Sequence, residues 1–195
     1  MAYKKASEHF FFYEFSPSGS SHDWLPPNYV VEKMIRSLAS NLQIVRDNMP
    51  ANSFLIITSG MRSLDDTLRL IKNGYHPSAT SDHNYGMPVS IDQQSPKYKI
   101  FGQYSSYSVG AVDCIPGGTN STAFDVFKLA VRLTKENKTK FGQVIYEENP
   151  QTGSKWIHFG NDPLTILSPD IVKLIAREQF LKSVDGGKTY QSYTA

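Results

Sequence analysis

Three residues of this chain are of types that bind catalytic metal ions, and each stands in unusual surroundings. His83 lies among turn-forming residues in the segment SDHNYG at 81–86. Asp113 interrupts an apolar run, where a carboxylate is costly unless it is paired or binds a metal. His158 shares one face of a strand-like run with Trp156. Catalytic zinc takes three such ligands, although the residues alone also permit a surface role for His83 and a hydrogen-bonded core role for His158.

Other metal-binding side chains are few. Cys114 is the only cysteine, which excludes an intrachain disulfide and a cysteine-based zinc site. His9, His22 and His76 lack comparable surroundings, and we expect them on the surface. A metal in this protein must therefore be held by histidine and carboxylate groups.

Four short motifs carry a resemblance to a known family. They are TSGMRS at 58–63, SDHNYG at 81–86, GAVD at 110–113 and WIH at 156–158. In this order they resemble the S-G-Y-R-S turn, the S-x-H-x-x-G and A-x-D motifs and the final W-x-H of the D-Ala-D-Ala carboxypeptidase and L-Ala-D-Glu endopeptidase family. That family shares its fold with the Hedgehog signalling domain. The resemblance is to the phage-type branch and covers about residues 8–160.

The resemblance implies a zinc metallopeptidase that hydrolyses peptide bonds in peptidoglycan stem peptides, of the D-Ala-D-Ala carboxypeptidase or L-Ala-D-Glu endopeptidase type. By its motifs, the zinc ligands would be His83, Asp113 and His158. Arg62 would bind the substrate carbonyl or carboxylate and assist catalysis.

Further residues around these motifs are expected to contact the substrate. Ser81 and Tyr85 flank the first histidine motif, and Trp156 belongs to the last one. We expect them to bind the substrate together with Arg62, although aromatic residues beside a site also serve as packing.

The chain departs from the family pattern between the first histidine and the aspartate. In the family these residues follow one another almost at once, whereas here residues 87–109 intervene. We interpret this segment as an insertion across the cleft, serving as a lid or a partner-binding loop. It also introduces Asp92 as a rival ligand to Asp113. The family's A-x-D context favours Asp113.

The general base is expected in the strand before the last motif. Glu147 and Glu148 are adjacent, so their side chains point to opposite faces and at most one can reach the metal. If Glu148 pairs with Lys155, Glu147 shares the face of His158, and a register slip of one residue would reverse the choice. The segment QVIYE at 143–147 is similar to the family's Q-x-I-x-E strand, which favours Glu147.

The elements that would position these residues follow from apolar periodicity and turn signals. They indicate an α+β fold, a small antiparallel sheet with flanking helices, as in Hedgehog-like peptidases. The predicted helices run from a cap at Asn28 to Pro50, over 64–72, from a cap at Asn120 or Ser121 to about Lys138, and from a start at Ser168 over 171–181. The predicted strands span 53–58, 111–115, 143–147 and 155–159, with the last two joined as a hairpin.

The chain has the size and composition of a single domain. Its 195 residues are 39% hydrophobic, which is enough to bury one core. We expect the zinc peptidase domain at 1–165, with the insertion at 87–109. Residues 166–195 would form a C-terminal helix and a polar tail that packs on the same domain or extends from it.

Charge and hydropathy limit the partners. Twenty basic and 18 acidic residues give a net charge of +2 with no basic stripe, so we expect no nucleic-acid partner. The opening MAYKKASEH lacks the apolar core of a signal peptide, and no run reaches the length of a membrane span.

Without a signal peptide, the family resemblance favours a bacteriophage lysis protein held in the host cytoplasm until lysis, or a virion-associated protein that acts at the bacterial cell wall. Other virion proteins are then further candidate partners, and a cytoplasmic enzyme acting on recycled peptides is an alternative. The competing function is a virion structural or wall-binding protein with a non-hydrolytic peptidase fold.

Overall fold

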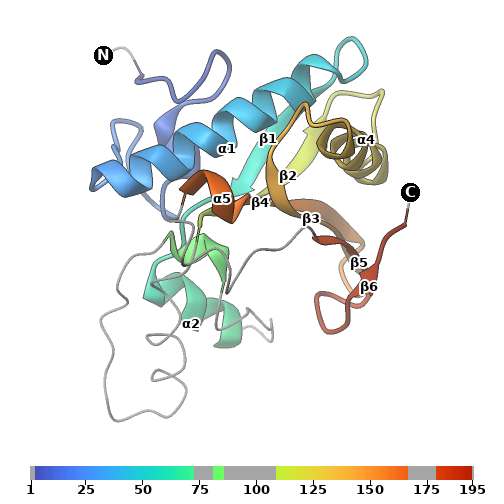
Figure 1. The fold of residues 1–195 in the computed structure, drawn as a ribbon. Helices are drawn as coiled ribbons and strands as arrows, with labels where there is room; N and C mark the ends of the chain where they lie inside the picture. Colours follow the sequence, from blue (N-terminus) through green and yellow to red (C-terminus); the bar gives the residue numbers. More distant parts are fainter. Residues whose placement is uncertain (1–2, 73–80, 86–108, 167–178, 195) are drawn as a thin grey trace.

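The computed structural model describes residues 3–72, 81–85, 109–166 and 179–194, and it shows an α+β fold on a six-stranded sheet (Figure 1). The predicted α+β class is confirmed. The strand order is β1-β2-β4-β3-β5-β6. In chain order the elements are η1 (Phe12–Phe15), α1 (Tyr29–Asp47), β1 (Phe54–Ser59), α2 (Leu64–Lys72), η2 (Asp82–Asn84), β2 (Ala111–Gly117), α4 (Ala123–Lys135), β3 (Phe141–Asn149), β4 (Ser154–Asn161), α5 (Pro163–Ile166), β5 (Gln179–Ser183) and β6 (Gln191–Ser192).

Helix α1 forms as its sequence predicts. The Asn28 side chain caps it by accepting a 3.0 Å hydrogen bond from the backbone N–H of Val31. The predicted apolar stripe is buried throughout: Val31, Met34, Ile35, Leu38, Leu42 and Val45. This stripe contributes much of the hydrophobic core.

Helix α4 begins later than expected. Its cap is Thr122 instead of Asn120 or Ser121, because Thr122 and Asp125 form a reciprocal capping box. The helix ends at Lys135, short of the predicted Lys138. Phe127 points into the core as predicted.

The sheet is mixed, which corrects the prediction of an antiparallel one. Strand β5 pairs in parallel with β3, while the other pairs are antiparallel. The predicted helix over 171–181 is therefore wrong at its end, where Gln179, Phe180 and Leu181 are strand residues. Pairing with the backbone of β3 outweighs the local helical signal there. The rest of that helix lies outside the described residues, as does the stretch 86–108.

The C-terminal tail also belongs to the sheet. Strand β6 pairs with β5, with Leu181 opposite Ser192 and Lys182 opposite Gln191. Residues after 166 thus add two strands to the edge beside β3.

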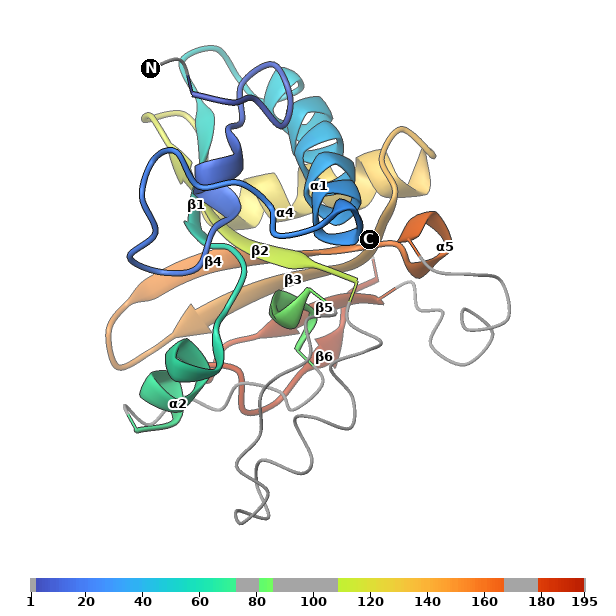
Figure 2. The same ribbon diagram turned by 90° about the vertical axis from the view of Figure 1, so that its left-hand side faces the viewer.

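The two faces of the sheet are covered differently. Figure 2 shows α1 and α4 over one face and α2 and η2 on the other. Since side chains alternate along a strand, each central strand sends one set of residues toward the helices and the next set toward α2 and η2. The candidate site lies on the face of α2 and η2.

Candidate metal centre

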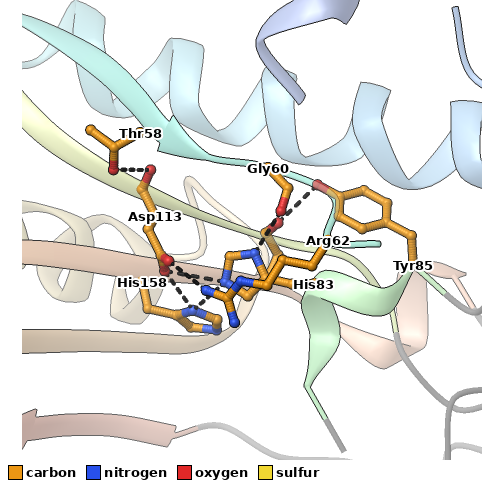
Figure 3. A network of polar contacts seen from close by, with 8 residues as sticks. Thr58, Gly60, Arg62, His83, Tyr85, Asp113 and His158 are labelled. Carbon is orange, nitrogen blue, oxygen red and sulfur yellow. Dashed lines mark hydrogen bonds and ion pairs between the residues drawn. The ribbon is translucent and has the colours of Figure 1, made fainter. Parts of the chain in front are cut away.

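Three predicted ligands converge on one point. Oδ1 of Asp113 lies 3.0 Å from Nδ1 of His158 and 3.2 Å from Nε2 of His83, and these two nitrogens are 3.2 Å apart. All three residues are buried. Figure 3 shows their side chains pointing toward one another from β2, β4 and η2. Within the described ranges, they are the one cluster of metal-binding side chains close enough to hold an ion.

Strand register brings two of the ligands together. Asp113 on β2 is directly opposite His158 on β4. Directly opposed residues on neighbouring strands place their side chains side by side on the same face. The antiparallel pairing of β2 with β4 is therefore what turns two residues 45 positions apart into neighbours.

The third ligand is oriented from the backbone. Nδ1–H of His83 donates a 2.7 Å hydrogen bond to the carbonyl oxygen of Gly60. A carbonyl can only accept, so the proton is on Nδ1, and Nε2 faces Asp113 and His158 as a lone pair. Such a hydrogen bond on the far nitrogen is usual for metal-binding histidines. The backbone N–H of Arg62 also donates to the carbonyl of His83 at 2.8 Å.

Gly60 is placed by tight packing against the N-terminal segment. A Cβ at position 60 would lie 2.5 Å from the backbone carbonyl carbon and oxygen of Phe15. The next residue, Met61, donates its N–H to the Phe15 carbonyl at 2.8 Å. Only glycine allows this approach, and it fixes the carbonyl that orients His83.

Tyr85 supports η2 from within the core. The side chain is 1% exposed and its hydroxyl donates a 2.9 Å hydrogen bond to the carbonyl of Ala111. Figure 3 shows its hydroxyl directed to the backbone and not to the three side chains of the cluster. Its backbone adopts a left-handed conformation with φ of 52°, which ends η2 directly after the His83 turn. Tyr85 therefore lies beneath the site and is not one of the residues that line the cleft.

Arg62 holds the second oxygen of the ligand carboxylate. Its Nη2 lies 2.9 Å from Oδ2 of Asp113, and both side chains are largely buried. Burial alone would raise the pKa of Asp113, but His83, His158 and Arg62 outweigh it and hold that pKa well below the usual value. Burial lowers the pKa of His83, so this imidazole is neutral at pH 7. Asp113 is accordingly ionised beside a neutral ligand.

The donor set fits a small cation. His83 Nε2 and Asp113 Oδ1 are both electron-pair donors, and a proton on Nδ1 of His158 could serve only one of them well. An ion among the three atoms would satisfy all of them at once. We therefore conclude that these buried side chains lie close enough to bind a metal ion.

Glu147 is the glutamate on the face of the candidate metal site. It lies opposite Trp156 while Glu148 lies opposite Lys155, which is the register on which the sequence-based choice depended. Glu148 points the other way, accepting a hydrogen bond from Tyr146 and pairing with Lys155. Burial, and then the charge of Asp113, raise the pKa of Glu147 to about 7. A carboxyl group with this pKa can accept and release a proton near neutral pH.

An open cleft of about 870 Å³ surrounds the cluster. Of the predicted substrate contacts, Arg62, Ser81 and Trp156 line it. Asp92, the alternative ligand, lies outside the described residues, as does His76, while His9 and His22 are exposed as predicted.

Gly187 and Tyr190 are among the residues of the cleft wall that were not predicted. They follow β5 in a segment whose sequence has no recognisable site motif. Only the pairing of β5 with β3 brings them near Glu147.

Comparison with protein-family models, with curated proteins and with solved structures finds no match. No helix among the described residues is long and apolar enough to cross a membrane.

Proposed function

We propose that this protein is a zinc peptidase that hydrolyses peptide bonds in peptidoglycan stem peptides. The observation that carries the proposal is the buried His83–Asp113–His158 cluster with Glu147 on the same face of one cleft. Three ligands of this kind with an adjacent carboxylate are the usual composition of a hydrolytic zinc site.

The spacing of the ligand atoms is compatible with zinc. With zinc–ligand bonds of about 2.0–2.1 Å, tetrahedral geometry separates ligand atoms by about 3.3 Å. The separations here are 3.0 to 3.2 Å. Histidine nitrogen and carboxylate oxygen are also zinc's ordinary ligands where cysteine is absent. When bound, zinc would supply Lewis acidity and lower the pKa of water.

Glu147 is the proposed general base and acid. As a carboxylate it accepts a proton from the attacking water and then delivers that proton to the leaving amine. Its pKa of about 7 suits both transfers. Glu148 cannot share this role, because it lies on the opposite face and pairs with Lys155.

Arg62 is proposed to act in two ways. Through Nη2 it holds Asp113 in the orientation that presents Oδ1 to the two histidines. A guanidinium has five N–H donors, and Arg62 also lines the cleft, so further donors can bind a substrate carbonyl or carboxylate. Ser81 and Trp156 line the same cleft and are proposed substrate contacts.

The substrate class rests on the motif order described above. D-Ala-D-Ala carboxypeptidase and L-Ala-D-Glu endopeptidase activities are both compatible with an open cleft large enough for several peptide residues. In this proposal the protein is a bacteriophage lysis enzyme or a virion component that degrades the host cell wall.

The decisive experiment combines metal analysis with turnover. Purified protein is stripped with a chelator, reloaded with one equivalent of zinc, and incubated with muropeptides whose products are identified by mass spectrometry. We expect cleavage only after reloading, at a single type of bond. A His9→Ala protein, changed at an exposed histidine, is the matched control and should retain zinc and turnover. Stoichiometric zinc without turnover on any muropeptide would favour the non-hydrolytic wall-binding function instead.

A further inference from the structure

The segment after β5 borders the proposed general base. Ser183, the last residue of β5, pairs with Glu147 in the parallel register. Three residues later, the backbone N–H of Gly186 donates a 3.0 Å hydrogen bond to the carbonyl of Glu148. The turn between β5 and β6 is thereby fastened to β3 beside Glu147.

Internal hydrogen bonds fix the shape of this turn. The Asp185 carboxylate accepts hydrogen bonds from the backbone N–H groups of Lys188 and Thr189, each at 3.0 Å, and from the Ser183 hydroxyl at 2.9 Å. The same Ser183 oxygen accepts a 3.1 Å hydrogen bond from the N–H of Gly187. The turn therefore holds its residues in place against the cleft.

Gly187 lies in tight contact with two polar groups. A Cβ at this position would lie 3.0 Å from the hydroxyl oxygen of Tyr190 and 3.2 Å from Oε2 of Glu147. The Tyr190 hydroxyl and the Glu147 carboxylate therefore both lie directly beside Gly187, and a side chain at position 187 would displace one of them or both. All three residues line the cleft.

Tyr190 offers a hydrogen-bond donor beside Glu147. The residue is 47% exposed, so a ligand in the cleft can reach it. Partial burial, and then the negative charge of Glu147, raise the pKa of its hydroxyl well above the usual value, which keeps the group protonated. A protonated phenol beside a proton-transferring carboxylate can hydrogen-bond a substrate acceptor near the reacting bond.

We propose that Tyr190 is a substrate-binding residue of the peptidase site: its hydroxyl donates a hydrogen bond to the carbonyl oxygen of the residue that leaves as the amine, beside Glu147. This inference rests on the proposed function. Because Glu147 delivers its proton to the leaving amine, the substrate residue next to Glu147 is the one that carries this amine.

The first test removes the hydroxyl and the acceptor separately. Kinetics of zinc-loaded wild type and Tyr190→Phe are compared on a stem pentapeptide and on its analogue with that carbonyl replaced by methylene. Loss of one hydrogen bond should lower kcat/KM of Tyr190→Phe roughly five- to tenfold on the pentapeptide and leave it unchanged on the analogue. An equal ratio on both substrates overturns the proposal.

The second test adds a methyl group that presses on the Tyr190 hydroxyl and Glu147. Gly187→Ala and Gly186→Ala both place a side chain at positive φ, 81° and 76°, and so carry similar backbone strain. The methyl at 186 would meet only Asn149 at 3.8 Å, whereas the methyl at 187 would meet the Tyr190 hydroxyl at 3.0 Å and Glu147 at 3.2 Å. With matched Tm values, we expect Gly187→Ala to lose at least about ten times more kcat/KM than Gly186→Ala. Equal losses contradict the proposal.

If the protein is not a peptidase, the kinetic experiments give a different result from a failure of the Tyr190 proposal. In that case the zinc-loaded wild type would release no amine from any muropeptide. Calorimetric binding of the same pentapeptide and analogue then decides the role of Tyr190. A preference of wild type for the pentapeptide that Tyr190→Phe lacks supports the contact, and equal affinities or no binding reject it.

Discussion

The two faces of the central strands differ in composition and in purpose, although their residues alternate along the same backbone. Toward α1 and α4, strands β2, β4 and β3 present a fully buried apolar set: Val112, Cys114, Ile157, Phe159 and Val144. Toward the cleft, the same strands present Asp113, His158 and Glu147. The difference teaches that one strand can supply the hydrophobic core from one face and polar groups of the site from the other, while His83 is added from η2.

The face of the sheet toward the cleft contains a buried charged group, whose burial costs folding free energy. The face toward α1 and α4 presents the apolar core residues named above. A buried carboxylate is strongly unfavourable unless it is compensated. Asp113 is compensated twice, by His158 at Oδ1 and by Arg62 at Oδ2. Because neighbouring residues serve opposite faces, substitutions one position apart should separate metal binding from folding.

The largest effect is expected from Asp113→Asn. The amide keeps the shape of the side chain but removes the anionic oxygen that both histidines face, so zinc content should fall from one equivalent to almost none and turnover should disappear. Zinc is measured by elemental mass spectrometry after dialysis. Cys114→Ala, at the adjacent fully buried position, should cost about 1–2 kcal/mol of stability and leave zinc content unchanged. An Asp113→Asn protein that kept zinc would remove this carboxylate from the ligand set.

The next effect separates the two adjacent glutamates. Glu147→Gln cannot accept a proton, so kcat should fall by about a hundred- to ten-thousandfold while zinc remains bound. Glu148→Gln alters a side chain that faces away and pairs with Lys155, so its kcat should stay within about twofold. Single-turnover rates on the same muropeptide provide the measurement. Equal kcat losses in the two variants would show that Glu147 has no special role in proton transfer.

A substitution in the hydrophobic core should lower stability and leave zinc binding intact. Phe159 is fully buried and packs against Phe141, with ring centroids 5.0 Å apart. Phe159→Ala should reduce the free energy of unfolding by about 3–5 kcal/mol, measured by denaturant titration. Its folded fraction should still bind one zinc per chain. If zinc affinity fell as far as in Asp113→Asn, the two faces would not be separable.

The smallest effect is a pH dependence of stability caused by Glu147. Its folded pKa, about 7, lies above the ordinary value of 4.5, so the folded state binds this proton more tightly than the unfolded state. The contribution to stability is therefore fully present below pH 4.5 and is lost as pH rises to about 7. In zinc-free protein, Glu147→Gln should gain stability relative to wild type over this window, by at most about 3 kcal/mol. A difference between the two proteins that is constant from pH 4 to 8 would contradict the raised pKa.

Local signals were sufficient to predict much of the fold. The Asn28 cap and the spacing from Val31 to Val45 define α1, because both act within a few residues. The turn between Asn149 and Ser154 sets the hairpin register, and with it the side of the sheet on which Glu147 lies. The three ligands could be selected because their residue types are chemically distinctive and because their motifs resemble those of a known family.

Other features depend on contacts between distant segments and carry no local signal. The sequence around Gln179 favours a helix, and only the backbone of β3 makes it a strand. The position of Tyr85 next to the His83 motif predicts a residue of the cleft. Its ring is instead buried under the site, and its hydroxyl donates a hydrogen bond to the carbonyl of Ala111. Tyr190 lies in a polar tail with no motif, so its position near Glu147 could not be anticipated.

The fit of Gly60 against Phe15 has a consequence for how mutations in this protein should be understood. Position 60 holds no reactive atom, yet every other side chain would collide with the Phe15 backbone and displace the carbonyl that orients His83. In a map of tolerated substitutions, position 60 would thus be as intolerant of change as the candidate metal ligands. The site should therefore tolerate a side chain at position 60 no better than it tolerates replacement of the residues that carry its chemistry.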